Sequence, residues 1–170
     1  GLAFVAILLL LRWNKISAAS LGVILDESLK SRKGTRNALF LKDWLVSETE
    51  RADSAKHLWA DFRFVLKKMG FCRAELKLGE QTRSFYVPNT PHDSLEQLWT
   101  ATHRTHGEVE VVLTLYAEKA HFTQSQFGLT ADIATEALVK VRAKWKDLYG
   151  ESLDFDAVAH DLADYRMHRA

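Results

Sequence analysis

The nearest approach to a chemical site in the sequence is the segment His103-Arg104-Thr105-His106. Two histidines bind one metal ion only when both rings reach the same point. The segment lies in a stretch with strand-like alternation, and side chains along a strand point to opposite faces in turn, so the two rings diverge. We therefore expect a solvated strand edge here and no shared metal ion.

No other catalytic pattern occurs in the sequence. It contains no glycine-rich phosphate loop, no H-E-x-x-H, no G-x-S-x-G and no carboxylate pair at a metal-binding spacing. The single cysteine, Cys72, cannot form an internal disulfide and is expected to be a small buried thiol. We therefore predict no catalytic residue, no cofactor-binding residue and no metal ligand in this chain.

Composition is that of one ordinary domain with attachments. Hydrophobic residues make up 47% of the 170 residues, which is enough to form a core. The formal net charge is only +1, so no overall field favours nucleic acid, and we expect no nucleic-acid partner. Charge therefore acts only locally, and the lone cysteine fits the cytosol.

The first eleven residues, GLAFVAILLLL, carry no charge and are followed at once by Arg12 and Trp13. This order is typical of a membrane helix that leaves the bilayer at an interface anchor. A spanning helix needs about 20 apolar residues, so the run corresponds to about half of one. We expect residues 1–13 to be the end of a truncated transmembrane helix. A buried helix of a soluble domain is the alternative.

A basic segment follows the apolar run. Seven basic residues between positions 12 and 42 stand against only Asp26 and Glu27. By the positive-inside rule, this flank predicts that the rest of the chain lies on the cytosolic side of the inner (plasma) membrane. It can also bind anionic lipid, at about 1 kcal/mol per basic residue; a topology signal without lipid binding is the alternative. The expected membrane-interface residues are Arg12, Trp13, Lys15, Lys30, Arg32, Lys33 and Arg36.

Helical periodicity covers the next part of the chain. Residues 14–46 are predicted to form a basic juxtamembrane segment with helices at 17–29 and 37–46. Ser47-Glu48-Thr49-Glu50 matches a capping box, so a new helix is predicted to begin there and to end at Gly70. Its apolar stripe is Leu58, Phe62, Val65, Leu66 and Met69, widened by Trp59.

After Gly70 the apolar period changes to the alternation of strands. Residues 73–78 and 82–87 are predicted to form one hairpin, with its turn at 79–81. Residues 97–106 and 109–117 are predicted to form a second hairpin, with its turn at Gly107-Glu108.

A long amphipathic helix is predicted after the second hairpin. Thr123 is placed to cap it, and it ends near Gly150; Asp154 then begins a short C-terminal helix within residues 148–170. Trp145 in this helix is expected in the core, whereas Trp44 is expected at the membrane interface. The inward stripe is Phe127, Ile133, Ala134, Ala137, Leu138, Val141 and Trp145.

The order of helix, two hairpins and helix predicts an α+β domain at residues 47–147, in which an antiparallel sheet is flanked by long helices. Its end, VEVVLTLY at 109–116 and then FTQSQF at 122–127, resembles a GAF-type sensory domain. In that family a central strand precedes a helix that starts with F-[ST]-x-x-x. The segment from Leu58-Trp59 through Met69-Gly70-Phe71 into residues 73–78 resembles the start of the same domain.

Together with the apolar run and the basic flank, this layout resembles the cytosolic C-terminal tail of bacterial polyprenyl-phosphate sugar-1-phosphate transferases. The resemblance implies a parent enzyme that transfers a UDP-sugar phosphate to undecaprenyl phosphate with Mg²⁺, and whose catalytic residues lie upstream. This chain is then a non-catalytic regulatory or scaffolding tail, with membrane lipid as a partner and homodimerisation through its flanking helices. The alternative is a GAF-like ligand-sensing module of a membrane signalling protein, whose ligand the sequence does not name.

Overall fold

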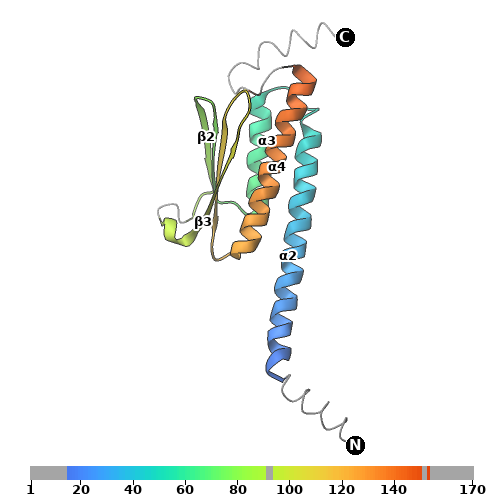
Figure 1. Cartoon of the computed structure of the whole chain (residues 1–170), viewed down its shortest axis with the longest axis vertical. Helices are drawn as coiled ribbons and strands as arrows, with labels where there is room; N and C mark the ends of the chain where they lie inside the picture. The colour runs from blue at the N-terminus through green and yellow to red at the C-terminus, as the bar shows by residue number, and fades with distance from the viewer. Residues whose placement is uncertain (1–14, 91–93, 151–152, 154–170) are drawn as a thin grey trace, which may run out of the picture. The chain divides into compact units, whose positions relative to one another are not determined.

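The computed structural model describes residues 15–90, 94–150 and 153, in two compact units, Gly1–Arg36 and Asn37–Ala170 (Figure 1). The predicted membrane segment at 1–13 and the C-terminal helix from Asp154 lie outside the described residues. No described helix combines the length and apolarity needed to cross a membrane. The second unit begins at Asn37, before the domain boundary expected at Ser47.

Helix α2 (Lys15–Glu48) is continuous where the sequence suggested two separate helices. The residues expected to separate them, 30–36, are mostly lysine and arginine, which favour helix, and a single Gly34 costs only about 1 kcal/mol. The unit boundary between Arg36 and Asn37 falls inside this helix.

Helix α3 (Ala55–Met69) begins later than predicted, so the expected start at Ser47 is wrong. Ser47 lies in the last turn of α2, and Thr49 donates its hydroxyl hydrogen bond back to the Leu45 carbonyl, 3.2 Å away. The actual cap is Ser54, whose Oγ accepts a hydrogen bond from the His57 amide at 3.2 Å. The predicted end is confirmed, because Gly70 adopts the left-handed conformation with φ of 102°.

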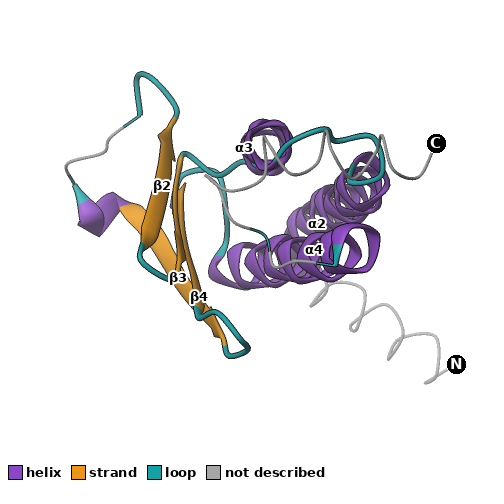
Figure 2. Ribbon diagram, turned by 90° about the horizontal axis from the view of Figure 1, so that it is seen from above, coloured by secondary structure: helices purple, strands orange, loops and turns teal. Residues whose placement is uncertain are grey.

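Four strands form one antiparallel sheet, as predicted. They are β1 (Arg73–Leu78), β2 (Gln81–Tyr86), β3 (Leu98–Thr105) and β4 (Val111–Glu118), and a short 3-10 helix, η1 (Leu95–Gln97), precedes β3. The strand order is β2-β1-β4-β3, so the two predicted hairpins are joined along β1 and β4. Figure 2 shows α3 and α4 on one face of this sheet. The expected α+β architecture is confirmed.

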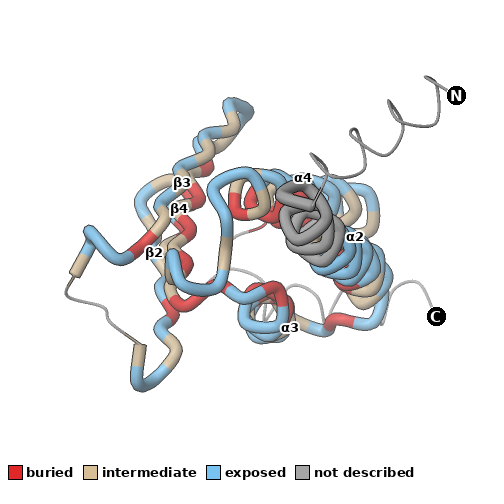
Figure 3. Tube along the Cα trace, turned by 90° about the horizontal axis from the view of Figure 1, so that it is seen from below, coloured by how far each residue is buried: buried red, intermediate tan, exposed pale blue. Residues whose placement is uncertain are grey.

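Helix α4 (Gln124–Tyr149) has both predicted ends. Thr123 and Gln126 form a reciprocal capping box, and Gly150 ends the helix in the left-handed conformation. Every residue of its predicted inward stripe is buried. Figure 3 shows the buried positions gathered where sheet and helices face each other.

The C-terminal part of α2 belongs to the same core. Ala38, Leu41 and Leu45 are buried together with side chains of α3, α4 and the sheet. Trp44, expected at a membrane interface, packs against this core instead, with its ring centroid 5.8 Å from that of Phe64. The assignment of Trp44 to a membrane interface was wrong because residues 37–46 were interpreted as a separate juxtamembrane helix, whereas their apolar side chains pack into the core.

Candidate functional site

The predicted membrane-interface residues lie at the N-terminal end of the chain. Lys30, Arg32, Lys33 and Arg36 are exposed on α2. Arg36 is one helical turn from Arg32 and from Lys33, so these three side chains can act on one surface. Lys15 is the first residue of α2, and Arg12 and Trp13 lie outside the described residues.

The two histidines of the nearest metal-like pattern do not meet. His103 lies on β3, half-buried, with its Nε2 3.8 Å from Asp132 Oδ1 of α4. His106 lies beyond the end of β3 and is exposed. Within the described ranges no group of three or more His, Cys, Asp or Glu side chains is arranged to hold a metal ion.

Cys72 is buried, as predicted. Its Sγ donates a hydrogen bond to the Tyr116 carbonyl at 3.4 Å, and burial raises the pKa of the thiol. A raised pKa keeps the sulfur protonated at neutral pH, which makes it a poor nucleophile. Its burial and raised pKa therefore favour a packing role for Cys72.

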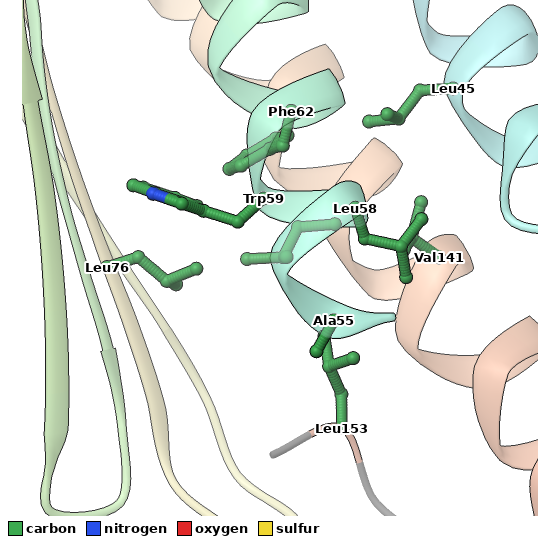
Figure 4. A pocket seen from close by; sticks show the side chains of 9 residues that line it. Leu45, Ala55, Leu58, Trp59, Phe62, Leu76, Val141 and Leu153 are labelled. Atoms are coloured by element: carbon green, nitrogen blue, oxygen red, sulfur yellow. The ribbon is translucent and has the colours of Figure 1, made fainter. Parts of the chain in front are cut away.

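A small apolar cavity lies within the core, between the helices and the sheet (Figure 4). Leu45, Leu58, Trp59 and Leu76 are among its lining side chains. Its volume is about 20 Å³, whereas ligand sites measure roughly 300–1,000 Å³. It has room for about one water-sized sphere, and its apolar lining offers such a water no partners. This cavity is a packing defect and not a ligand site.

The sheet face that points away from the helices carries one ordered cluster. Arg73 forms an ion pair with Glu75, and its guanidinium lies 5.1 Å from the Tyr86 ring and 4.6 Å from the Tyr116 ring. The hydrogen bonds that Arg73 donates to the Glu75 carboxylate raise the pKa of Arg73, and partial burial raises the pKa of Tyr116. The register places Tyr86, Arg73 and Tyr116 side by side across three strands. The ion pair and the two ring contacts hold Arg73 in place, which suits a structural role for the cluster on this face.

A larger hollow lies between the turn after β3 and the C-terminal half of α4. Its volume is about 280 Å³, and its polar lining comes from Thr105, His106, Glu108, Arg142 and Lys146. The Nε of Arg142 and the Oγ1 of Thr105 are buried without a hydrogen-bond partner in the described structure. Burial lowers the pKa of Arg142. This hollow combines a volume near that of ligand sites, charged side chains and buried hydrogen-bond donors without partners in the described structure.

The sequence alone did not identify Arg142 and Thr105 as lining a polar hollow, although the position of each in its element gives an indication. Arg142 is four residues after Leu138, at the edge of the inward stripe of α4. Thr105 shares the inward phase of β3 with Trp99 and Ala101. A polar residue in phase with apolar ones is the available signal, and it becomes informative only when the opposing element is known.

Comparison with known proteins gives no further assignment: the chain matches no family model, no curated protein and no solved structure.

Proposed function

We propose that the chain is a non-catalytic regulatory or scaffolding module at the cytosolic face of the inner membrane. In this proposal it serves a glycosyl-1-phosphate transferase that acts on undecaprenyl phosphate in cell-envelope polysaccharide synthesis. The Mg²⁺ that such a reaction uses belongs to the catalytic part of the transferase and not to this chain.

The single observation that carries the proposal is the burial of α2 in the α+β core. Ala38 and Leu45 retain only 2% and 1% of their exposure, and Lys42 of the same stretch pairs with Glu136 of α4 at 3.3 Å. The basic residues 30–36 precede this buried stretch on the same helix. In this proposal, membrane binding by these residues regulates the domain through the continuous backbone of α2.

We further infer a GAF-like fold for this α+β unit. β4 is a central strand, paired with β1 on one side and β3 on the other. Phe122-Thr123 follows it, and Thr123 caps α4. This is the order of central strand and helix start on which the GAF resemblance rests.

A homodimer through the flanking helices is part of the same proposal. Phe64 on α3 and Leu129 and Val139 on α4 are 48%, 46% and 43% exposed, so apolar surface is available on both helices. Analytical ultracentrifugation of the full chain should show a concentration-dependent dimer, and a monomer at all concentrations would contradict this part.

Membrane attachment is tested by sedimentation of the full chain with vesicles of neutral lipid, with and without anionic lipid. The double variant Lys33→Gln/Arg36→Gln should weaken binding to anionic vesicles by up to about thirtyfold, from about 1 kcal/mol for each charge. The matched control is Arg63→Gln/Lys67→Gln, which removes the same two residue types from exposed positions on α3. Equal effects of the two double variants would contradict the role of the α2 residues.

The link to a transferase is tested in the membrane enzyme that the proposal assigns. Leu45→Ala should change sugar-1-phosphate transfer, whereas Leu39→Ala on the same helix should not, because Leu45 is buried and Leu39 is 39% exposed. The loss of core stability is measured in both variants. If neither substitution then changes the transfer rate, the regulatory role is contradicted, whereas the description of the fold still stands.

A further inference from the structure

The hollow at the end of the sheet is open enough to admit a small molecule. Its volume of about 280 Å³ is close to the lower end of ligand sites, roughly 300 Å³. Its lining combines polar groups, among them Thr105 and Arg142, with apolar side chains, among them Val139 and Ala143. Such a combination fixes the orientation of a ligand that has one polar and one apolar end.

Two buried donors at this hollow lack acceptors. The Nε of Arg142 and the Oγ1 of Thr105 have no hydrogen-bond partner in the described structure. Buried polar groups in native proteins are almost always paired, and an unpaired one calls for a water, an ion or a ligand. These two groups come from different elements, β3 and α4, yet both line the same hollow.

One of the two cationic side chains at the hollow has no counter-charge among the described residues. Lys146 is neutralised by Glu108, with Nζ 2.9 Å from Oε1. Arg142 forms no ion pair with any described residue, and its burial is unopposed by a counter-charge, which lowers its pKa. A half-buried guanidinium without a counter-ion favours an anion at its donors, because the planar fork matches a carboxylate or a phosphate.

We propose that this hollow binds a small organic anion, whose carboxylate or phosphate group accepts hydrogen bonds from Arg142 and Thr105. Its apolar part, a few carbons long, lies against Val139 and Ala143, while Lys146 stays paired with Glu108. The net charge of Arg142, Lys146 and Glu108 is +1, which matches one anionic group. The site does not depend on the membrane attachment proposed above, since all of its residues belong to the unit that begins at Asn37.

The test is nuclear magnetic resonance on the full chain, labelled with nitrogen-15. Butyrate and inorganic phosphate are titrated separately, which distinguishes a carboxylate ligand from a phosphate ligand, and chloride at the same ionic strength is the control. The probes are the Nε–H of Arg142 and the backbone amide of Gly107, which also lines the hollow. We expect saturable shifts of both signals with at least one of the two anions, at a dissociation constant of about 1 mM or tighter.

Two variants and a matched control locate the binding. Arg142→Met keeps the aliphatic stem but removes the charge, so it should weaken binding at least tenfold without loss of stability in the ligand-free chain. Thr105→Val removes the hydroxyl with little change of shape and should weaken binding less. Arg104→Met is the control, because Arg104 is the neighbouring residue on β3, pairs with Glu110 at 3.1 Å and does not line the hollow.

Saturation with an anion that is lost in Arg142→Met and kept in Arg104→Met supports the site. The proposal is overturned if neither anion shifts the two signals beyond the effect of chloride, in which case water alone occupies the hollow. It is equally overturned if Arg142→Met and Arg104→Met weaken binding alike. If Arg142→Met does not fold, unchanged affinity in Thr105→Val together with shifts spread over the whole surface would overturn it.

Discussion

Leu45 tests whether α2 is part of the folded core or only leads into it. The side chain is 1% exposed and borders the small apolar cavity. Leu45→Ala removes about three carbon groups, worth about 2.4 kcal/mol at about 0.8 kcal/mol for each. The void left by the substitution adjoins the existing cavity of about 20 Å³, and the cost of that added volume comes on top of the lost transfer free energy. We therefore expect the free energy of unfolding to fall by about 3 to 5 kcal/mol.

The measurement is urea unfolding of the full chain followed by tryptophan fluorescence, with the slope of the transition checked for each variant. Leu39→Ala is the matched control, since it makes the same substitution on the same helix at a 39% exposed position and should cost about 1 kcal/mol or less. If Leu45→Ala and Leu39→Ala destabilise equally, the segment around Leu45 does not belong to the core, and the coupling proposed for α2 fails with it.

Three further predictions follow from single positions. Gly70→Ala should destabilise the fold by more than about 1 kcal/mol, because φ is 102° and a Cβ would meet an aromatic ring at 2.8 Å. Gly128→Ala, with nothing within 4 Å of the added Cβ, should stabilise α4 by up to about 1 kcal/mol. Equal melting temperatures of the two variants would contradict this. Cys72 should react with an alkylating reagent only as the chain unfolds in urea, since burial raises its thiol pKa; rapid alkylation of the native chain would refute its placement. The hydrogen bond from Lys140 lowers the pKa of Glu136, so its stabilisation is complete above the unfolded value of about 4.3 and is lost as pH falls through the lower folded value. Glu136→Gln should flatten that acid-side decline in urea midpoints, and an unchanged pH profile would count against the pairing.

Periodicity identified the parts of the fold whose two faces differ. The alternation at residues 73–78 and the stripe from Phe127 to Trp145 predicted β1 and the buried face of α4, because one side of each element is apolar and the other polar. Gly70 and Thr123 could be recognised as helix ends, because their conformation and hydrogen bonds are local. These features depend on residues a few positions apart.

Features that depend on residues far apart in the sequence could not be predicted from it. Ser47 and Ser54 both satisfy the local rules for a helix cap, and the core contacts of Leu45 decide between them by extending α2 past Ser47. The hollow beside Arg142 is formed by a turn and a helix far apart in the sequence, so no spacing announces it. The sequence shows the chemistry of each side chain, but it does not show which side chains lie close together in the fold.

The strand order β2-β1-β4-β3 has a consequence for the speed of folding. Each hairpin closes over a short turn, at Gly79 in one case and at Gly107 in the other, which takes microseconds. The pairing of β1 with β4 joins residues far apart in the sequence, from Leu78 with Val111 to Arg73 with Tyr116, so it has a larger loop-closure cost than either hairpin. The docking of two preformed hairpins is therefore the expected rate-limiting step. Substitutions along the β1–β4 seam should slow refolding, whereas those on the outer strands should mainly speed unfolding.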